Sequence, residues 1–270
     1  MNPVTVVEGT SPIILGLPHT GTFVPDDIHA CLNAEGKKLR DTDWHIHRLY
    51  DGLLPGASTV RATFHRYCID ANRDPGGESL YPGQTTTSLV PLTDFDNQAI
   101  WNEGMAPDAA EIARRVELFH APYHAALAAE IARVKAIHGI AVLYDCHSIR
   151  PEIPYLFDGV LPDFNIGTDN GGACAVEIEA STFAVCSSAK GYTSILNGRF
   201  RGGWTTRHYG RPESGVHAIQ MELTQSTHLS NSPEPFTYDA AKAAALRAHL
   251  ADILKRIETI ALSLASGDRP

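Results

Sequence analysis

Long hydrophobic runs, an excess of positive charge and thiol motifs are all missing from this chain of 270 residues. Because no run of about 18 apolar residues occurs, we expect no transmembrane helix. The first residues lack the basic and apolar regions of a signal peptide, so we expect a cytoplasmic protein. The formal net charge of -9 argues against a protein that coats nucleic acid or an anionic membrane.

Several motifs of other enzyme classes are also absent. The five cysteines never form a C-x-x-C pair, which argues against a disulfide framework or a thiolate zinc site. There is no G-x-S-x-G elbow, no G-x-G-x-x-G fingerprint and no phosphate-binding P-loop. Cys146 is a weak candidate nucleophile, because its neighbours Asp145 and His147 are expected to point to the opposite side of a strand.

The order of predicted elements indicates an α/β fold. With 43% hydrophobic residues, no internal repeat and no linker, residues 1–270 are expected to form a single domain. Strands alternate with helices, which predicts a sheet covered by helices on both faces. The predicted strands are 13–17, 57–63, 66–69, 140–144, 164–167 and 217–223. The predicted helices are 43–54, 108–138 with an interruption at Pro122, 173–190 and 239–265. Long loops are expected at 74–97, 149–172 and 197–212.

Polar side chains stand at or just beyond the ends of these strands. They are His19, the Asp70 to Arg73 segment, His147 and Glu222. Ligands bind at this edge in open α/β sheets, which makes these residues the candidate site.

His19 and His147 could hold a zinc ion. A catalytic zinc takes about three ligands from His and Asp or Glu, and leaves a fourth position for water. Asp43, in the acidic segment before a predicted helix, is our choice for the third ligand. The alternative is that both histidines are hydrogen-bonded structural residues.

Glu222 lies within an otherwise apolar strand, where an unpaired carboxylate is costly. Burial would raise its pKa, which suits a general base that accepts a proton from metal-activated water. A buried salt bridge to a loop arginine is the equally weighted alternative.

Basic and amide side chains predict an anionic ligand. Arg66 begins the predicted strand 66–69, and Asn72 and Arg73 follow its end. Arginine binds carboxylates through a planar fork. A second group occupies the glycine-rich loop 197–212, which we expect to fold over a ligand. It comprises Arg199, Arg201, Arg207, His208 and Arg211.

Six segments, in this order, resemble the N-formylglutamate deformylase (N-formylglutamate amidohydrolase) family. They are Pro18-His19-Thr20-Gly21, Asp41-Thr42-Asp43-Trp44-His45, Arg66 with Asp70-Ala71-Asn72-Arg73, Asp145-Cys146-His147-Ser148, Asn197-Gly198-Arg199-Phe200-Arg201-Gly202-Gly203, and Glu222. The resemblance extends from about residue 13 to residue 228. More distantly, these segments resemble zinc carboxypeptidases and aspartoacylases.

The resemblance implies a three-layer α/β/α fold with a mixed central sheet, zinc-carboxypeptidase-like (phosphorylase/hydrolase-like). It also implies one Zn²⁺ ion, or another divalent metal, and hydrolysis of N-formyl-L-glutamate to formate and L-glutamate in histidine degradation. His19 and His147 match metal ligands, and Glu222 matches the catalytic base. Arg66, Asn72, Arg73, Arg199, Arg201 and His208 are assigned to binding of the small dicarboxylate substrate.

One departure concerns the second metal ligand. The distant relatives have Glu three residues after their first histidine, where this chain has Thr22, so Asp43 is an inference. Asp41, His45 and His47 are its competitors. Two other functions stay open at this point: hydrolysis of a different N-acyl amino acid, and non-catalytic binding of a small anion.

Overall fold

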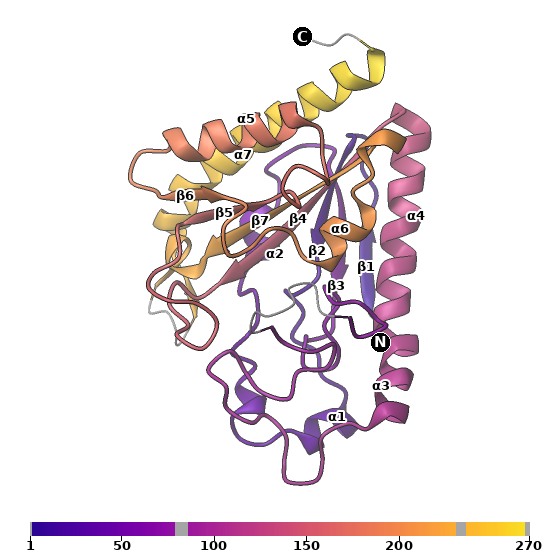
Figure 1. Cartoon of the computed structure of the whole chain (residues 1–270), viewed down its shortest axis with the longest axis vertical. Helices are drawn as coiled ribbons and strands as arrows, with labels where there is room; N and C mark the ends of the chain where they lie inside the picture. Colours follow the sequence, from indigo (N-terminus) through magenta and orange to yellow (C-terminus); the bar gives the residue numbers. More distant parts are fainter. Residues whose placement is uncertain (1, 79–85, 231–235, 268–270) are drawn as a thin grey trace.

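A seven-stranded sheet with helices on both faces forms the centre of the protein (Figure 1). The computed structural model describes residues 2–78, 86–230 and 236–267. In spatial order the strands are β1 (Val4–Val7), β3 (Ser58–Ala62), β2 (Ile13–Leu17), β4 (Ala141–Ile149), β7 (Val216–Thr224), β5 (Phe164–Gly167) and β6 (Ser194–Leu196).

The sheet is mixed, as the family resemblance implies. Strands β3, β2, β4 and β7 are parallel neighbours, whereas β1 runs antiparallel to β3 and β5 antiparallel to β7. Strand β6 is parallel to β5. The carboxyl ends of the four central strands therefore meet at one edge, where open α/β sheets bind ligands.

Different sets of helices cover the two faces of the sheet. One face packs against α2 (Ile46–Tyr50), α5 (Val176–Ser188) and α7 (Ala240–Ser266). The other packs against α4 (Ala121–His138) and α6 (Trp204–Tyr209), with α3 (Ala109–Arg115) and the π-helical turn η2 (Val116–His120) leading into α4 (Figure 1). Shorter elements are α1 (Asp26–Cys31), η1 (Gly36–Lys38), η3 (Pro212–Ser214), η4 (Gln225–Thr227) and the hairpin β8 (Leu229–Ser230) with β9 (Thr237–Tyr238). Within the described residues, no helix has the length and apolar character needed to cross a bilayer.

Strand β4 shows how the two cores are separated. Val142, Tyr144 and Cys146 belong to the core beneath α5 and α7, whereas Ala141 and Leu143 belong to the core beneath α4. Successive side chains of a strand point to opposite faces, so this division follows from the period of two.

The face of β4 that packs on α4 becomes polar toward the carboxyl end of the strand. After Leu143, the next two side chains of this face are Asp145 and His147, both buried. Gly16 of β2 is the register partner of Asp145, and a Cβ at Gly16 would lie 3.1 Å from the Asp145 carboxylate. Cys146 lies on the opposite face, as expected, and burial raises the pKa of its thiol well above the usual value. A thiolate nucleophile is therefore not favoured.

The predicted strand at 66–69 is wrong. The chain forms a turn there, in which the Cys68 amide donates to the His65 carbonyl at 2.9 Å. The predicted helix at 43–54 shortens to α2, because His45 adopts a left-handed conformation (φ 61°) before it and the chain leaves the helix at Asp51. Loop 197–212 contains α6, a helix that the Gly and Arg content of this segment obscures.

The predicted interruption at Pro122 is confirmed. Helix α4 begins at Ala121, immediately after the π-helical turn η2, and Pro122 occupies its first turn. Proline has no N–H to donate to the preceding turn, and its ring crowds that turn, so a regular α-helix cannot pass through unchanged.

The core beneath α7 supplies a test of the fold. Leu250 is completely buried, whereas Leu262 on the same helix is 47% exposed. We expect Leu250→Ala to lower the free energy of unfolding by about 2–5 kcal/mol through lost burial and a cavity. Leu262→Ala, the matched control, should change it by no more than about 0.5 kcal/mol. Urea unfolding of both variants measures the difference, and equal effects would contradict the assigned packing.

Candidate active site

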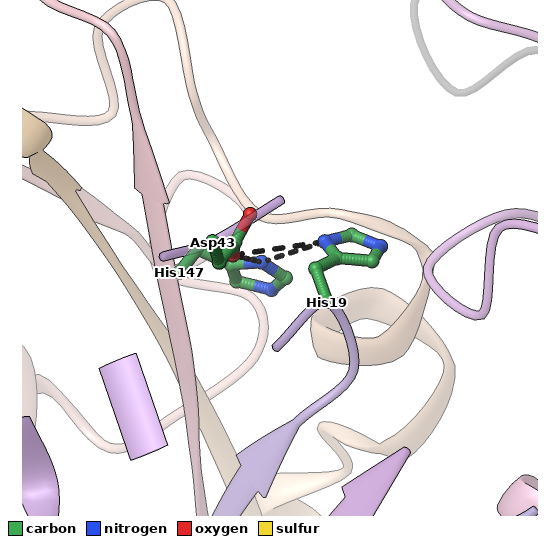
Figure 2. Close-up of side chains that lie close together, drawn as sticks. All are labelled: His19, Asp43 and His147. Carbon is green, nitrogen blue, oxygen red and sulfur yellow. Dashed lines mark hydrogen bonds and ion pairs between the residues drawn. The ribbon is translucent and has the colours of Figure 1, made fainter. Parts of the chain in front are cut away.

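Two histidines and one aspartate from separate elements point toward one another (Figure 2). His19 follows β2, His147 belongs to β4, and Asp43 lies in the loop before α2. The two Nδ1 atoms are 3.2 Å apart, and the Asp43 Oδ2 lies 3.3 Å from Nδ1 of His147 and 3.8 Å from Nδ1 of His19. All three side chains are buried.

These distances fit a divalent metal. Donor atoms at about 2.0–2.1 Å from a tetrahedral zinc are separated from one another by about 3.3 Å. Two imidazole nitrogens and a carboxylate oxygen are also the donor types of catalytic zinc sites. The residues present therefore suit a three-ligand metal site with one further coordination position.

The second nitrogen of each histidine faces a carboxylate. Nε2 of His19 donates to Asp70 Oδ1 at 2.7 Å, and Nε2 of His147 donates to Asp145 Oδ2 at 2.9 Å. With the proton assigned to Nε2 by these partners, each Nδ1 keeps its lone pair for a metal. Sequence reasoning gave no role to Asp145, although a spacing of two residues on a strand places it on the same face as His147.

The competing ligands lie elsewhere. The Asp41 carboxylate accepts from the Tyr67 hydroxyl at 2.9 Å and from the Phe95 amide at 3.0 Å. His45 donates from Nε2 to the Phe236 carbonyl at 3.0 Å. Among the described residues, the group of potential ligands that comes together is His19, Asp43 and His147, so His47 is not part of it.

The site is an array of buried charges. Burial alone would raise the pKa of Asp43, but the hydrogen bond from His147 and the nearby positive charges lower it. Burial opposes a charge on His147, yet Asp145 and Asp43 raise its pKa well above the usual value. His19 has a lowered pKa because of burial and the adjacent Arg66. The carboxylates thus favour a positive charge at this point, which a metal ion can supply in place of a proton.

Glu222 lies beside these ligands. It is the register partner of His147 on the neighbouring strand β7, so both side chains occupy the same face. Its carboxylate accepts a hydrogen bond from Gln220 Nε2 at 3.1 Å. Burial raises the pKa of Glu222 to about 8, despite the opposing influence of His147, and the charge of Arg66 has a smaller effect. This environment favours the general-base interpretation over a buried salt bridge.

A cavity of about 310 Å³ opens over this edge of the sheet. Its lining includes the three potential ligands and Glu222, together with the predicted substrate-binding side chains Arg66, Asn72, Arg73 and Arg199. Arg201 and His208 are not among its lining residues. A guanidinium nitrogen of Arg66 lies 2.7 Å from Nδ1 and 2.9 Å from Nε2 of His19, which places a positive charge next to the potential ligands.

The glycine-rich loop therefore contributes one of its four arginines to the cavity. Arg201 donates to the Gly198 carbonyl at 3.3 Å, and Arg207 pairs with Asp169 at 3.3 Å. His208 stacks on Trp204, with ring centroids 4.2 Å apart. Arginine content marked this loop as important, but composition could not tell which side chain faces inward.

Asn72 lies between the glycine-rich loop and the potential ligands. Its Nδ2 lies 3.2 Å from Nε2 of His147, and its Oδ1 accepts from the Thr205 amide at 2.9 Å. A Cβ at Gly203 would lie 2.3 Å from the Asn72 amide nitrogen, so only glycine allows this close approach.

Two histidines of the η2–α4 helix hold the backbone on either side of Asn72. His124 donates from Nε2 to the Ala71 carbonyl at 2.7 Å, and His120 donates to the Arg73 carbonyl at 3.0 Å. Burial lowers the pKa of His124 to about 3, so it stays neutral. Neither histidine was singled out from the sequence, because an isolated histidine on a helix carries no pattern.

Comparison with known proteins identifies the family of the chain. The sequence model described as N-formylglutamate amidohydrolase matches residues 11–229. The chain belongs to the N-formylglutamate amidohydrolase family. The matched range contains all three potential ligands, Glu222 and the lining arginines, so the family match includes the whole of the candidate site.

Curated relatives align over most of their length. An N-formylglutamate deformylase of Pseudomonas aeruginosa is 46% identical over 251 residues, which are 93% of this chain and 94% of the relative. A protein of the same name from Pseudomonas putida is 45% identical over 86% of each chain.

Solved structures support the fold. The N-formylglutamate amidohydrolase from Ralstonia eutropha JMP134 superposes with a TM-score of 0.75 at 24% identity, covering 100% of this chain and 99% of that one. A gene product of Agrobacterium tumefaciens gives 0.73 at 19% identity over 96% of each chain. At these identities the likeness concerns the fold alone.

The raised pKa of Glu222 makes stability depend on pH. In the metal-free folded protein this carboxyl keeps its proton up to a pH of about 8, whereas the unfolded chain loses it near the model value of 4.5. Because folding then binds a proton, stability falls as pH rises between these two values. Glu222→Gln removes this contribution, so its unfolding free energy relative to the unsubstituted protein should increase from pH 5 to about pH 8.

Urea unfolding of the metal-free proteins across this range measures the effect. Asp41, whose pKa burial raises to about 7, remains in the variant, so the slope should become shallower and not vanish. Parallel stability curves for the two proteins would show that Glu222 ionises normally.

Proposed function

We propose that this protein hydrolyses N-formyl-L-glutamate to formate and L-glutamate with the help of a divalent metal, in histidine degradation. The observation that carries the proposal is the convergence of His19, Asp43 and His147 beside buried Glu222 in an arginine-lined cavity. Family membership and two curated relatives named N-formylglutamate deformylase support the choice of substrate. Cytoplasmic localisation and the absence of nucleic-acid or membrane partners stay predictions.

The cavity suits a small dicarboxylate. Arg66, Arg73 and Arg199 lie in its wall and supply guanidinium groups that can bind carboxylates through paired hydrogen bonds. Arg73 is already fixed, because it donates to the Thr87 carbonyl at 2.9 Å and to the Thr87 hydroxyl at 2.7 Å. We assign Asn72, Arg73 and Arg199 to the glutamate part of the substrate. Arg201 and His208 lie outside the lining and have no direct contact role in this proposal.

His19, Asp43 and His147 would hold the metal, for which we propose zinc because of the donor set. When bound, such an ion lowers the pKa of water and polarises a carbonyl group. Arg66, next to His19, adds a fixed positive charge where the formyl oxygen gains negative charge during attack.

Glu222 moves the protons. As a buried carboxylate it accepts a proton from the attacking water, whose oxygen forms a bond to the formyl carbon. It then gives this proton to the amide nitrogen as the C–N bond breaks. The water oxygen thus ends in formic acid, and the nitrogen leaves as an amine. The acid then loses its proton and the amine takes one up, which gives formate and L-glutamate. A raised pKa suits both steps, because the group must take a proton and release it again near neutral pH.

Formate release from N-formyl-L-glutamate tests the reaction. We expect Glu222→Gln to lower kcat by about 10²- to 10⁴-fold, the usual contribution of a general base. Glu213→Gln, at an exposed position, is the matched control and should retain activity. Undiminished turnover in Glu222→Gln would exclude Glu222 as the base.

The same assay after chelation tests the metal. Activity should disappear on removal of the metal and return with zinc. Release of formate that survives complete chelation would refute metal dependence. A protein that binds zinc but releases no formate would point to a different N-acyl amino acid, and a protein without turnover on any such compound would be an anion-binding protein.

Asp43 is the third ligand in this proposal. We expect Asp43→Ala to weaken zinc binding by more than the roughly 10- to 100-fold that accompanies loss of an outer-shell partner. Asp41→Asn, two residues away in the same loop, should bind zinc as the unsubstituted protein does. Competition with a chromophoric chelator measures both affinities, and tight one-to-one binding by Asp43→Ala would disprove the assignment.

A further inference from the structure

The loop that carries Asp43 has a strained backbone. His45, two residues later, has φ 61° and ψ 10°, a left-handed conformation that costs free energy for any residue other than glycine. Asp43 itself precedes α2 and so gains no support from a regular helix. Such a conformation persists only when surrounding contacts determine it.

Two of the contacts that hold this loop come from the residues directly after β7. Gln225 donates from Nε2 to the Thr42 carbonyl at 3.0 Å, and His228 donates from Nε2 to the Trp44 carbonyl at 3.1 Å. These two carbonyls stand on either side of Asp43. Both side chains are buried, His228 completely, so water does not compete strongly for the bonds.

Phe236, farther along the chain, also contacts this loop. The rings of Trp44 and Phe236 stack with centroids 5.1 Å apart, and His45 donates to the Phe236 carbonyl at 3.0 Å. Thr42, Trp44 and His45, which flank Asp43, are therefore all attached to residues that follow β7, namely Gln225, His228 and Phe236. The remaining freedom of Asp43 is small: its amide donates to the His19 carbonyl at 3.0 Å, and its Oδ2 accepts from the Ser148 amide at 3.1 Å.

We propose that Gln225 and His228 are positioning residues that hold Asp43 in its ligating geometry and thereby set the metal affinity of the site. Neither residue is in the group of potential ligands or in the lining of the cavity. The inference rests on the metal site of the proposed function. Strand β7 then supports two parts of the site. It carries Glu222, and it continues directly into the residues that hold the proposed third ligand, Asp43.

The expected effect follows from the ordering of the loop. When the hydrogen bond to a flanking carbonyl is lost, the strained loop can adopt other conformations. Metal binding must then order Asp43, and the conformational entropy lost in doing so weakens the binding. Loss of outer-shell support typically weakens metal binding by about 10- to 100-fold. His228→Phe and Gln225→Leu remove one donor each and should both show a decrease in this range.

Cobalt titration of the metal-free, full-length protein tests the inference. Co²⁺ reports both its affinity and, through its visible absorption, the set of ligands around it. We expect His228→Phe and Gln225→Leu to bind Co²⁺ about 10-fold or more weakly and to alter the visible spectrum. His228→Gln should restore the affinity in large part, because its amide can donate to the same carbonyl.

A matched control separates positioning from general destabilisation. His217 lies on the same strand β7 at its opposite end, where its Nδ1 accepts from the Ala175 amide at 3.0 Å. We expect both His217→Phe and His228→Phe to lower the thermal unfolding temperature, but His217→Phe should leave the Co²⁺ affinity unchanged. Should His228→Phe fail to fold, Gln225→Leu carries the test.

The outcomes are distinct. Unchanged Co²⁺ affinity in Gln225→Leu and His228→Phe, or an equal loss in His217→Phe, would overturn the inference. Failure of the unsubstituted protein to bind Co²⁺ would overturn the metal site and this inference with it. Weaker binding in the two variants, with rescue by His228→Gln, would establish the positioning role even in a protein that releases no formate from N-formyl-L-glutamate.

Discussion

Burial of like charges at one edge of the sheet is the constraint on which the rest of the site depends. The side chains of Asp43, Asp70 and Glu222 are all buried, and uncompensated negative charge is unfavourable at buried positions. Arg66 and His147 supply positive charge, and a divalent ion would supply more. The arrangement holds Asp70 charged, with its pKa well below the usual value although burial opposes this, while Glu222 has a raised pKa. One group can therefore orient a histidine while the other exchanges protons.

The loops around the charges are fixed through their backbones. Side chains from other elements bond the carbonyls next to Asn72 and next to Asp43, and leave both functional side chains free to face the cavity. Loops alone would be too mobile to keep a ligand within the short distances that metal coordination requires. The sheet provides the rigid part of the site, and these buried bonds extend its rigidity to the loops.

Much of the site could be predicted because its residues stand at the ends of predicted strands. His19, His147 and Glu222 were identified from short apolar runs that end in a polar residue, and parallel strands bring such ends to one edge. The strand expected at 66–69 was wrong, since apolar residues in a buried turn give the same local pattern as a strand. Arg201 could not be distinguished from Arg199, because both stand in one glycine-rich loop whose path depends on contacts with distant residues.

The sequence by itself determined the α/β class, the mixed sheet expected of the family, and the residue types that make metal-assisted hydrolysis the favoured chemistry. The alternation of side chains along a strand and the polar residues at strand ends are local patterns, so they can be recognised without knowledge of the fold. Only the tertiary structure decided which acid joins the two histidines, which arginine faces the cavity, and that Gln225 and His228 hold the Asp43 loop. These contacts join residues up to 184 positions apart in the chain, and no local pattern encodes such a pairing.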